Sequence, residues 1–235
     1  MHLGDFEGVS DNCDINPNLI KNNVGTDNLD NTIEPRELRF DLLPMDRWNI
    51  AKYNEMFQRY TNYLNKYEIG KGLKEAEKFF WNFCDNYIEI IKNRLYKPDI
   101  YGEVAKKSGQ IACYKVLLGI LKCFAIYIPH ITEEVYKNFY EKHENHFSIH
   151  LTEIAPIEEG SLNDIITLGD RVVDFISQVR KYKSEHNISL KTELDEIKIY
   201  AKDVAFVNSV SYDIKATCHA LDIKVVESDV EKVEI

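Results

Sequence analysis

Apolar residues recur every three or four positions along several stretches of this chain, which is the spacing of one face of an α-helix. The first stretch follows Asp46, whose side chain suits a helix N-cap. We expect Gly70 and Gly72 to stop or bend this helix. Its apolar positions are Ile50, Tyr53, Phe57, Tyr60, Leu64 and Tyr67.

A second helix is predicted from about Leu73 to the residue before Pro98, because proline disfavours a helical conformation in the residue that precedes it. A third helix is predicted from about Gly109 to Pro129. The apolar face of the second helix comprises Leu73, Ala76, Phe80, Phe83, Tyr87 and Ile91, and that of the third comprises Tyr114, Leu117, Leu121, Phe124 and Ile128.

Thr132 is the expected N-cap of a fourth helix, with Glu133 and Glu134 in the first turn, where the helix dipole favours negative charge. Val135, Tyr136 and Phe139 supply its buried side. Residues 147–151 are expected to be extended. A long amphipathic helix then runs to about His186, with Ile165, Leu168, Val172, Ile176 and Val179 on its apolar face.

The apolar period changes from helical to alternating near the C-terminus. Residues 197–200 and 223–226 are typical of two short strands, and they flank a helix from about residue 204 to 212 or beyond. The predicted fold is therefore mainly α, an antiparallel helical bundle with a small C-terminal α/β appendage. We divide the chain into a lead-in (1–45) that is rich in Asn and Asp, a bundle (46–156), and a long helix with the appendage (157–235).

Charge narrows the classes of function. The chain has 29 Lys and Arg against 39 Asp and Glu, a formal net charge of −10. This balance argues against broad, non-specific binding to nucleic acid, but a shaped RNA site depends on where the cations lie. Local clusters occur at 92–97, 106–107 and 180–191. Each is either a solvated helix face or part of an RNA-binding surface.

The sequence offers no catalytic centre and no metal site. Glycine-rich phosphate loops and nucleophile elbows are absent, and no pair of carboxylates suggests an acid and a base. The spacing of His143, His146 and His150 favours an exposed loop over a metal site. The five cysteines include no C-x-x-C pair, which is typical of a reducing cytoplasm. The apolar run 116–128 contains Lys122 and is too short to span a membrane, so a buried helix is expected.

Several short motifs follow one another in the order of a known family. These are D-R-W at 46–48, W-N-F-C-D-N-Y-I-E at 81–89, I-P-H-I-T-E-E at 128–134, S-I-H-L at 148–151, and V-R-K at 179–181 followed by S-L-K at 189–191. Together they resemble the anticodon-binding helical domain of class I aminoacyl-tRNA synthetases, and most of all that of the valine enzyme.

This resemblance implies a region that binds the anticodon arm of tRNA(Val) in the cytoplasm. Aminoacylation with ATP and Mg would then take place on a catalytic domain, in a longer chain or a separate subunit, because the H-I-G-H and K-M-S-K-S signatures of that domain are absent here. The chain alone is expected to be inactive and to hold no cofactor. Residues 1–45 resemble the connector to that catalytic body.

Candidate tRNA-binding side chains follow from the cation clusters and the resemblance together. Anticodon bases are read on their edges and stacked on aromatic rings or Arg planes, while Lys and Arg contact phosphates. The alternative is a synthetase-derived helical module that docks a protein and does not bind RNA, which the net charge of −10 favours. The candidates are Arg47, Lys52, Lys92, Asn93, Arg94, Lys97, Arg180, Lys181 and Lys183.

Overall fold

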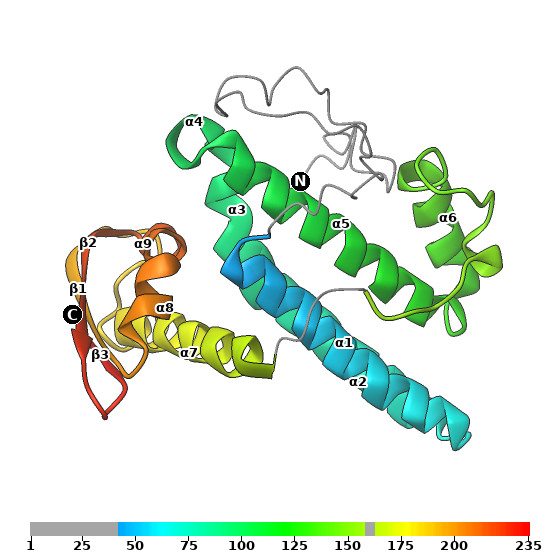
Figure 1. Ribbon diagram of the computed structural model, residues 1–235, viewed down its shortest axis with the longest axis horizontal. Coiled ribbons are helices and arrows are strands. Elements are labelled where there is room, and N and C mark those ends of the chain that lie inside the picture. Colours follow the sequence, from blue (N-terminus) through cyan, green and yellow to red (C-terminus); the bar gives the residue numbers. More distant parts are fainter. Residues whose placement is uncertain (1–41, 158–162) are drawn as a thin grey trace, which may run out of the picture.

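The computed structural model describes residues 42–157 and 163–235, and the remaining residues, including most of the predicted lead-in, lie outside the described part (Figure 1). The helices are α1 (Pro44–Asn65), α2 (Ile69–Asn82), the π-helical turn η3 (Phe83–Tyr87), α3 (Ile88–Tyr96), α4 (Pro98–Tyr101), α5 (Glu103–Ala125), α6 (Pro129–Phe139), the 3-10 turn η4 (Ile149–Leu151), α7 (Asn163–Glu185), α8 (Val204–Ser209) and α9 (Ser211–Cys218). The strands are β1 (Leu194–Ala201), β2 (Ala220–Glu227) and β3 (Lys232–Glu234). The predicted fold class is confirmed.

The helical part is built on α1, α2 and α5, which pack side by side along much of their length (Figure 1). Helix α6 lies against α5 at one end. Helix α7 leaves the middle of α1 and leads to the sheet, where α9 lies between α7 and α3. The predicted division at residue 157 adjoins residues outside the described part and stays a prediction.

Helices α2 and α3 form one continuous helix, interrupted only by the π-helical turn η3. Asn82 and Ile88 on either side of that turn both have right-handed helical backbone angles, so the axis continues through it. The turn contains most of the W-N-F-C-D-N-Y motif. A π turn inserts an extra residue into the helix and exposes backbone carbonyls, and such turns are frequent at functional sites.

An aromatic core joins these helices. Tyr53 and Tyr60 of α1 and Tyr87 of η3 are each 0% exposed. Two glycines allow the closest helix contacts, because a Cβ on Gly119 of α5 would lie 2.5 Å from the Tyr53 ring, and one on Gly169 of α7 would lie 2.2 Å from the Trp48 ring. Both rings thus pack directly on the backbone of a neighbouring helix.

Two predicted helix starts were wrong. Helix α1 begins at Pro44 with Leu43 as N-cap, and Asp46 lies buried inside the first turn. Helix α6 begins at Pro129, and the Thr132 hydroxyl donates to the carbonyls of Ile128 and Pro129 instead of capping the helix. In both cases a proline occupies the first helical position, where its missing N–H costs nothing.

Two further local predictions were wrong. Gly70 and Gly72 lie inside α2, and the break between α1 and α2 comes earlier, where Tyr67 has a φ of 59°. Residues 147–151 include the 3-10 turn η4, because the carboxylate of Glu133 accepts hydrogen bonds from Ser148 Oγ and Ile149 N and draws the segment into a turn.

Both predicted strands are confirmed as β1 and β2, which pair in parallel with Ile197 opposite Ile223. Parallel pairing needs a crossover, and α8 and α9 provide it in place of the single helix predicted there. A third strand, β3, was not predicted and adds to the other edge of β1 in antiparallel orientation, which gives the order β2-β1-β3.

Among the described residues, α5 is the one helix long and apolar enough to cross a membrane by length and composition. Most of its apolar window is buried inside the protein, and core helices of soluble proteins meet the same criterion. Cys113, Val116, Ile120 and Cys123, on its most deeply buried face, are each 0–1% exposed. The helix therefore packs as the centre of the bundle.

Candidate nucleic-acid interface

The ends of the two cation-bearing helices, α3 and α7, meet at α9. From α3, Asn93 Nδ2 donates to the carbonyl of Ala216 at 3.2 Å. From α7, Lys183 Nζ donates to the carbonyl of Cys218 at 2.8 Å. The last turn of α9 is thus held from two sides, and the clusters predicted separately at 92–97 and 180–191 become neighbours in space.

Lys92 and Lys97 of the candidate set lie on the surface at this junction. Lys92 is paired with Glu89 one turn away at 3.2 Å, and both side chains are about half exposed, so the pair is weak and open to competition. Lys97 follows the last residue of α3 and is exposed. Both lysines are therefore accessible to a polyanion.

Arg180 and Lys181 lie at the corresponding part of α7. Arg180 is half-buried, and its guanidinium donates to the carbonyl of Asp85 at 3.3 Å in the π turn η3. Lys181 is 76% exposed, and its one ion pair with a residue of the described part is a long one with Glu185 at 3.8 Å. Arg180 thus joins α7 to the bundle, whereas Lys181 faces solvent.

The two candidate residues on α1, Arg47 and Lys52, differ in whether they form an ion pair. Arg47 is exposed and forms no ion pair with any residue of the described part. Lys52 Nζ lies 3.1 Å from Asp170 Oδ2, and the other carboxylate oxygen, Oδ1, accepts a hydrogen bond from the Trp48 indole at 2.9 Å. Lys52 therefore joins α1 to α7, and Trp48 is a packing residue.

Arg94 does not lie on the surface, and its prediction as an RNA contact was wrong. Its side chain is 0% exposed and makes two hydrogen bonds of 2.8 and 2.9 Å to the carboxylate of Asp46. That carboxylate also accepts from Tyr87 Oη and Ser108 Oγ. Burial alone lowers the pKa of Arg94, but the charges of Asp46 and Asp213 raise it overall, so the guanidinium stays charged.

Asp213 of α9 approaches the same guanidinium from the other side. Arg94 Nε lies 3.0 Å from Asp213 Oδ1, yet neither carboxylate oxygen of Asp213 accepts an aligned hydrogen bond from the described residues. Burial of this carboxyl raises its pKa to about 7, although Arg94 opposes the shift. Two acids thus share one buried arginine, and only Asp46 is fully hydrogen-bonded.

Lys183 was also wrongly predicted as an RNA contact. The residue is 1% exposed, and its Nζ donates to the carbonyls of Leu190, Thr192 and Cys218 at 3.1, 2.6 and 2.8 Å. Burial lowers its pKa. Its ammonium ties the end of α7 to the segment before β1 and to the end of α9.

His219 is a residue at this junction that the sequence did not single out. It follows α9 directly, is exposed, and has a left-handed φ of 52°. Partial burial lowers the pKa of its imidazole, and the positive charges of Lys183, Lys97 and Lys92 lower it further. A lone histidine between a helix and a strand gives no recognisable signal in one sequence.

The remaining chemistry of the described residues is that of a packed core. Burial raises the pKa values of Cys113, Cys123 and Cys218 to about 12, so these thiols stay protonated.

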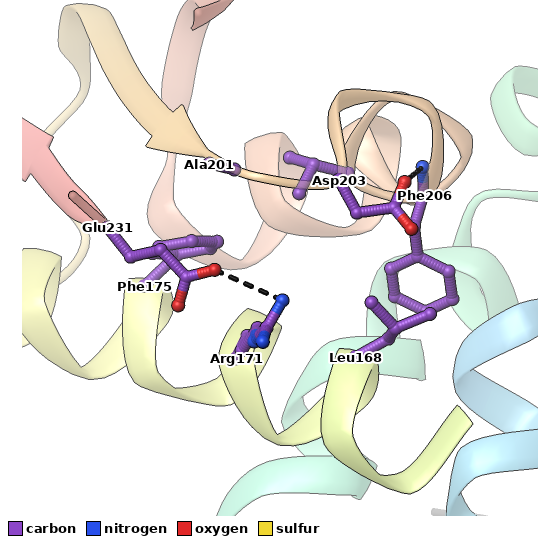
Figure 2. A pocket seen from close by; sticks show the side chains of 8 residues that line it. Leu168, Arg171, Phe175, Ala201, Asp203, Phe206 and Glu231 are labelled. Atoms are coloured by element: carbon purple, nitrogen blue, oxygen red, sulfur yellow. Dashed lines mark hydrogen bonds and ion pairs between the residues drawn. The ribbon is translucent and has the colours of Figure 1, made fainter. Parts of the chain in front are cut away.

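Figure 2 shows a depression beside α7 that is about the size of a water molecule and is bordered by the 3.1 Å ion pair of Arg171 with Glu231. It is too small for a nucleotide.

Comparison with known proteins agrees with this arrangement. The family described as "Anticodon-binding domain of tRNA ligase" matches residues 46–199, from α1 into β1. Valine–tRNA ligase of Wolbachia pipientis is 33% identical over 193 residues, which cover 80% of this chain and 21% of that protein. The corresponding enzyme of Thermococcus kodakarensis is 29% identical over 208 residues, 87% of this chain and 23% of that protein.

Valine–tRNA ligase of Pyrococcus furiosus gives a similar match, 30% identity over 192 residues. The chain spans about a fifth of the length of these relatives. The family match covers the helical bundle from the third residue of α1, together with α7 and most of β1. The chain therefore belongs to the family of anticodon-binding domains of tRNA ligases and is similar to that region of valine–tRNA ligases.

Proposed function

We propose that this chain binds the anticodon arm of tRNA(Val) and so directs the tRNA to a catalytic domain that this chain does not contain. The observation that supports this most is the family match over residues 46–199. It includes α3 and α7, the two helices whose cations approach each other at α9.

The geometry suggests how such a region would hold RNA. Exposed Arg47, Lys97 and Lys181 would contact phosphates, which fixes the register of the RNA without reading its bases. Lys92 would join them when RNA phosphate displaces Glu89 from their exposed pair. Anticodon bases are unstacked in their loop and thus free to contact side chains at the same surface.

The activity of a complete ligase is part of the same proposal. ATP and Mg would be used by the catalytic domain, in the cytoplasm, and this chain would contribute affinity and orientation only. We therefore expect the isolated chain to give no valine-dependent pyrophosphate exchange. A measurable exchange rate would show that the chain itself contains an activating site.

A gel-shift titration tests the proposal directly. The chain is titrated against tRNA(Val) transcript, the same transcript with a foreign anticodon, and an unrelated tRNA. We expect salt-sensitive binding that is strongest for the first. Equal affinity for all three RNAs would show that the chain binds tRNA without recognising the anticodon. Absence of binding at low salt would contradict the proposal.

Charge reversal locates the surface. Lys97→Glu should weaken the affinity for tRNA(Val) at least about tenfold, because it replaces an attraction to phosphate with a repulsion. Lys71→Glu is the control, since Lys71 is 60% exposed at the far end of α2 (Figure 1). Equal losses in both variants would indicate a non-specific charge effect.

The alternative of a protein-docking module rests on the net charge of −10 and on exposed apolar side chains around α6, including Ile131 at 63% and Phe147 at 70%. It predicts no salt-sensitive binding of any tRNA. The gel-shift titration therefore separates the two functions.

A further inference from the structure

The corner where α9 ends and β2 begins has an excess of positive charge. Lys183 lies beneath it as a buried cation that is bonded to three backbone carbonyls, and no carboxylate of residues 42–157 or 163–235 forms an ion pair with it. Lys92 and Lys97 approach from α3, which Asn93 attaches to the same turn of α9. Carbonyl dipoles solvate an ammonium without cancelling its charge, so the field reaches the surface.

His219 is the residue that joins α9 to β2 at this corner. Its carbonyl accepts a hydrogen bond from Leu194 N at 2.9 Å, which fixes its backbone between β1 and α9. The charges of Lys183, Lys97 and Lys92 all act on its imidazole, and Glu193 is the acid that opposes them. Repulsion among these cations disfavours a protonated imidazole until an anion compensates the charge.

The backbone at His219 would suit glycine better. The residue caps α9 in the left-handed conformation, which is strained for a residue with a side chain and unstrained for glycine. An imidazole is therefore present at a conformational cost, and, like Lys92 and Lys97, it is exposed to solvent.

We propose that Lys92, Lys97 and His219 form a binding site for a phosphate group of the RNA backbone. This inference rests on the proposed function and adds a residue beyond the family match, which ends at residue 199. The phosphate would lie between the end of α3 and the end of α9, displace Glu89 from Lys92, and accept a hydrogen bond from protonated His219.

Proton binding and RNA binding are linked at such a site. An RNA that binds the protonated form about tenfold more tightly raises the pKa of His219 by about one unit, by reciprocity. The side chains that act on this titration are Lys183 of α7, Lys92 of α3, Lys97 directly after α3, and Glu193 before β1. Affinity should therefore rise as the pH falls through the range where His219 takes up a proton.

The site-specific test is an NMR titration of the His219 imidazole in the full chain, assigned with His219→Gln. The pKa is measured alone, with inorganic phosphate, and with an anticodon-arm hairpin. We expect a rise of about one unit with the hairpin and a smaller rise with phosphate. RNA binding with an unchanged pKa of His219 would overturn the site and leave the proposed function intact.

His219→Gly separates binding from folding. It removes the imidazole and relieves the left-handed backbone, so the thermal stability should stay equal or increase, while the affinity for the hairpin below pH 6 falls about tenfold. Tyr67→Gly is the matched control, because Tyr67 has a φ of 59° and is 89% exposed at the α1–α2 turn. It should leave the affinity unchanged.

The outcomes separate the two proposals. If phosphate raises the pKa of His219 but no RNA binds, the corner is a site for small anions only, and both the RNA assignment and the proposed function fail. If RNA binds and His219→Gly binds equally well at every pH, the His219 site fails alone. Equal losses in His219→Gly and Tyr67→Gly would also overturn it.

Discussion

Arg94 shows how residue chemistry organises the junction between the bundle and the C-terminal segment. Its guanidinium faces Asp46 of α1 and Asp213 of α9, and all three side chains are 0–1% exposed. With both acids ionised, this buried group would carry a net negative charge. A buried pair is favourable only when its hydrogen bonds are complete, and Asp46 meets that condition while Asp213 does not.

The two aspartates should therefore respond differently to the same substitution. Asp46→Asn removes the negative charge and one of the two acceptor oxygens of a bidentate pair, and it should reduce the free energy of unfolding by about 3–5 kcal/mol at pH 8. Asp213→Asn removes a charge without an aligned donor and should leave that free energy equal or higher. Urea denaturation of both variants measures this, and equal losses would show that Asp213 stabilises the fold as an ion.

Stability should also depend on pH through Asp213. In the folded chain this carboxyl keeps its proton up to a pH of about 7, because burial raises its pKa, whereas an unfolded Asp releases it near 3.9. Its stabilising contribution is thus complete below about pH 4 and is lost as the pH rises to about 7.

Between pH 5 and pH 8 the wild-type free energy of unfolding should fall by about 2 kcal/mol through this group. Asp213→Asn should remove that part of the decrease, which urea denaturation at both values would detect. The same pH dependence in the wild type and the variant would assign the decrease to other groups.

The burial of individual charged side chains was the property that the sequence predicted least well. Arg94 and Lys97 have the same setting in the sequence, near the end of an amphipathic helix, yet one is buried and the other is exposed. The two acids that pair with Arg94 are far from it in the sequence. Asp46 is 48 positions before it, and Asp213 belongs to α9. Lys183 likewise bonds to carbonyls of three separate positions that no local pattern connects to it.

At the scale of elements, glycines set how closely helices approach. Gly169→Ala places a Cβ within 2.2 Å of the Trp48 ring, which is itself fixed by its hydrogen bond to Asp170. We expect a loss of about 1–3 kcal/mol in the free energy of unfolding, despite the better helix propensity of alanine.

Gly70→Ala is the control for that substitution. Nothing lies within 4 Å of a Cβ at Gly70, which is also helical, so this change should stabilise the chain by a few tenths to about 1 kcal/mol. Thermal denaturation compares the two. Stabilisation of both variants would show that α7 does not pack on Trp48 as described.

Periodicity predicted most elements, because the interior faces of long helices and short strands leave a clear pattern. It failed where tertiary contacts decide the local structure. Asp46 and Thr132 look like N-caps but serve a buried ion pair and backbone carbonyls. A 3.6-residue period also cannot reveal the π turn η3, since the apolar spacing across one extra residue stays nearly helical.

At the scale of the molecule, a net charge of −10 coexists with exposed cations at the ends of α3 and α7, where we propose that RNA binds. Much of the positive charge between the bundle and the C-terminal segment holds the fold together, as in Arg94, Lys183 and Lys52. The exposed cations are few and lie close together. We therefore expect weak binding to nucleic acids in general, and binding of RNA at one place on the surface.

Salt dependence tests this picture. Lys181→Gln should reduce the slope of log affinity against log salt by about 0.7–1, because one phosphate contact and its released counterion are lost. Lys137→Gln on α6 is the control, since Lys137 is also paired with a glutamate on its own helix and half exposed. The slope of log affinity against log salt for Lys137→Gln should equal that of the wild type.

The most direct measurement compares two RNA hairpins, one with the anticodon arm of tRNA(Val) and one with its acceptor arm, in filter binding to the chain at low salt. We expect that the anticodon hairpin alone retains most of the affinity of the whole tRNA and that the acceptor hairpin binds far more weakly. Equal affinity for both hairpins, or tighter binding of the acceptor arm, would contradict it.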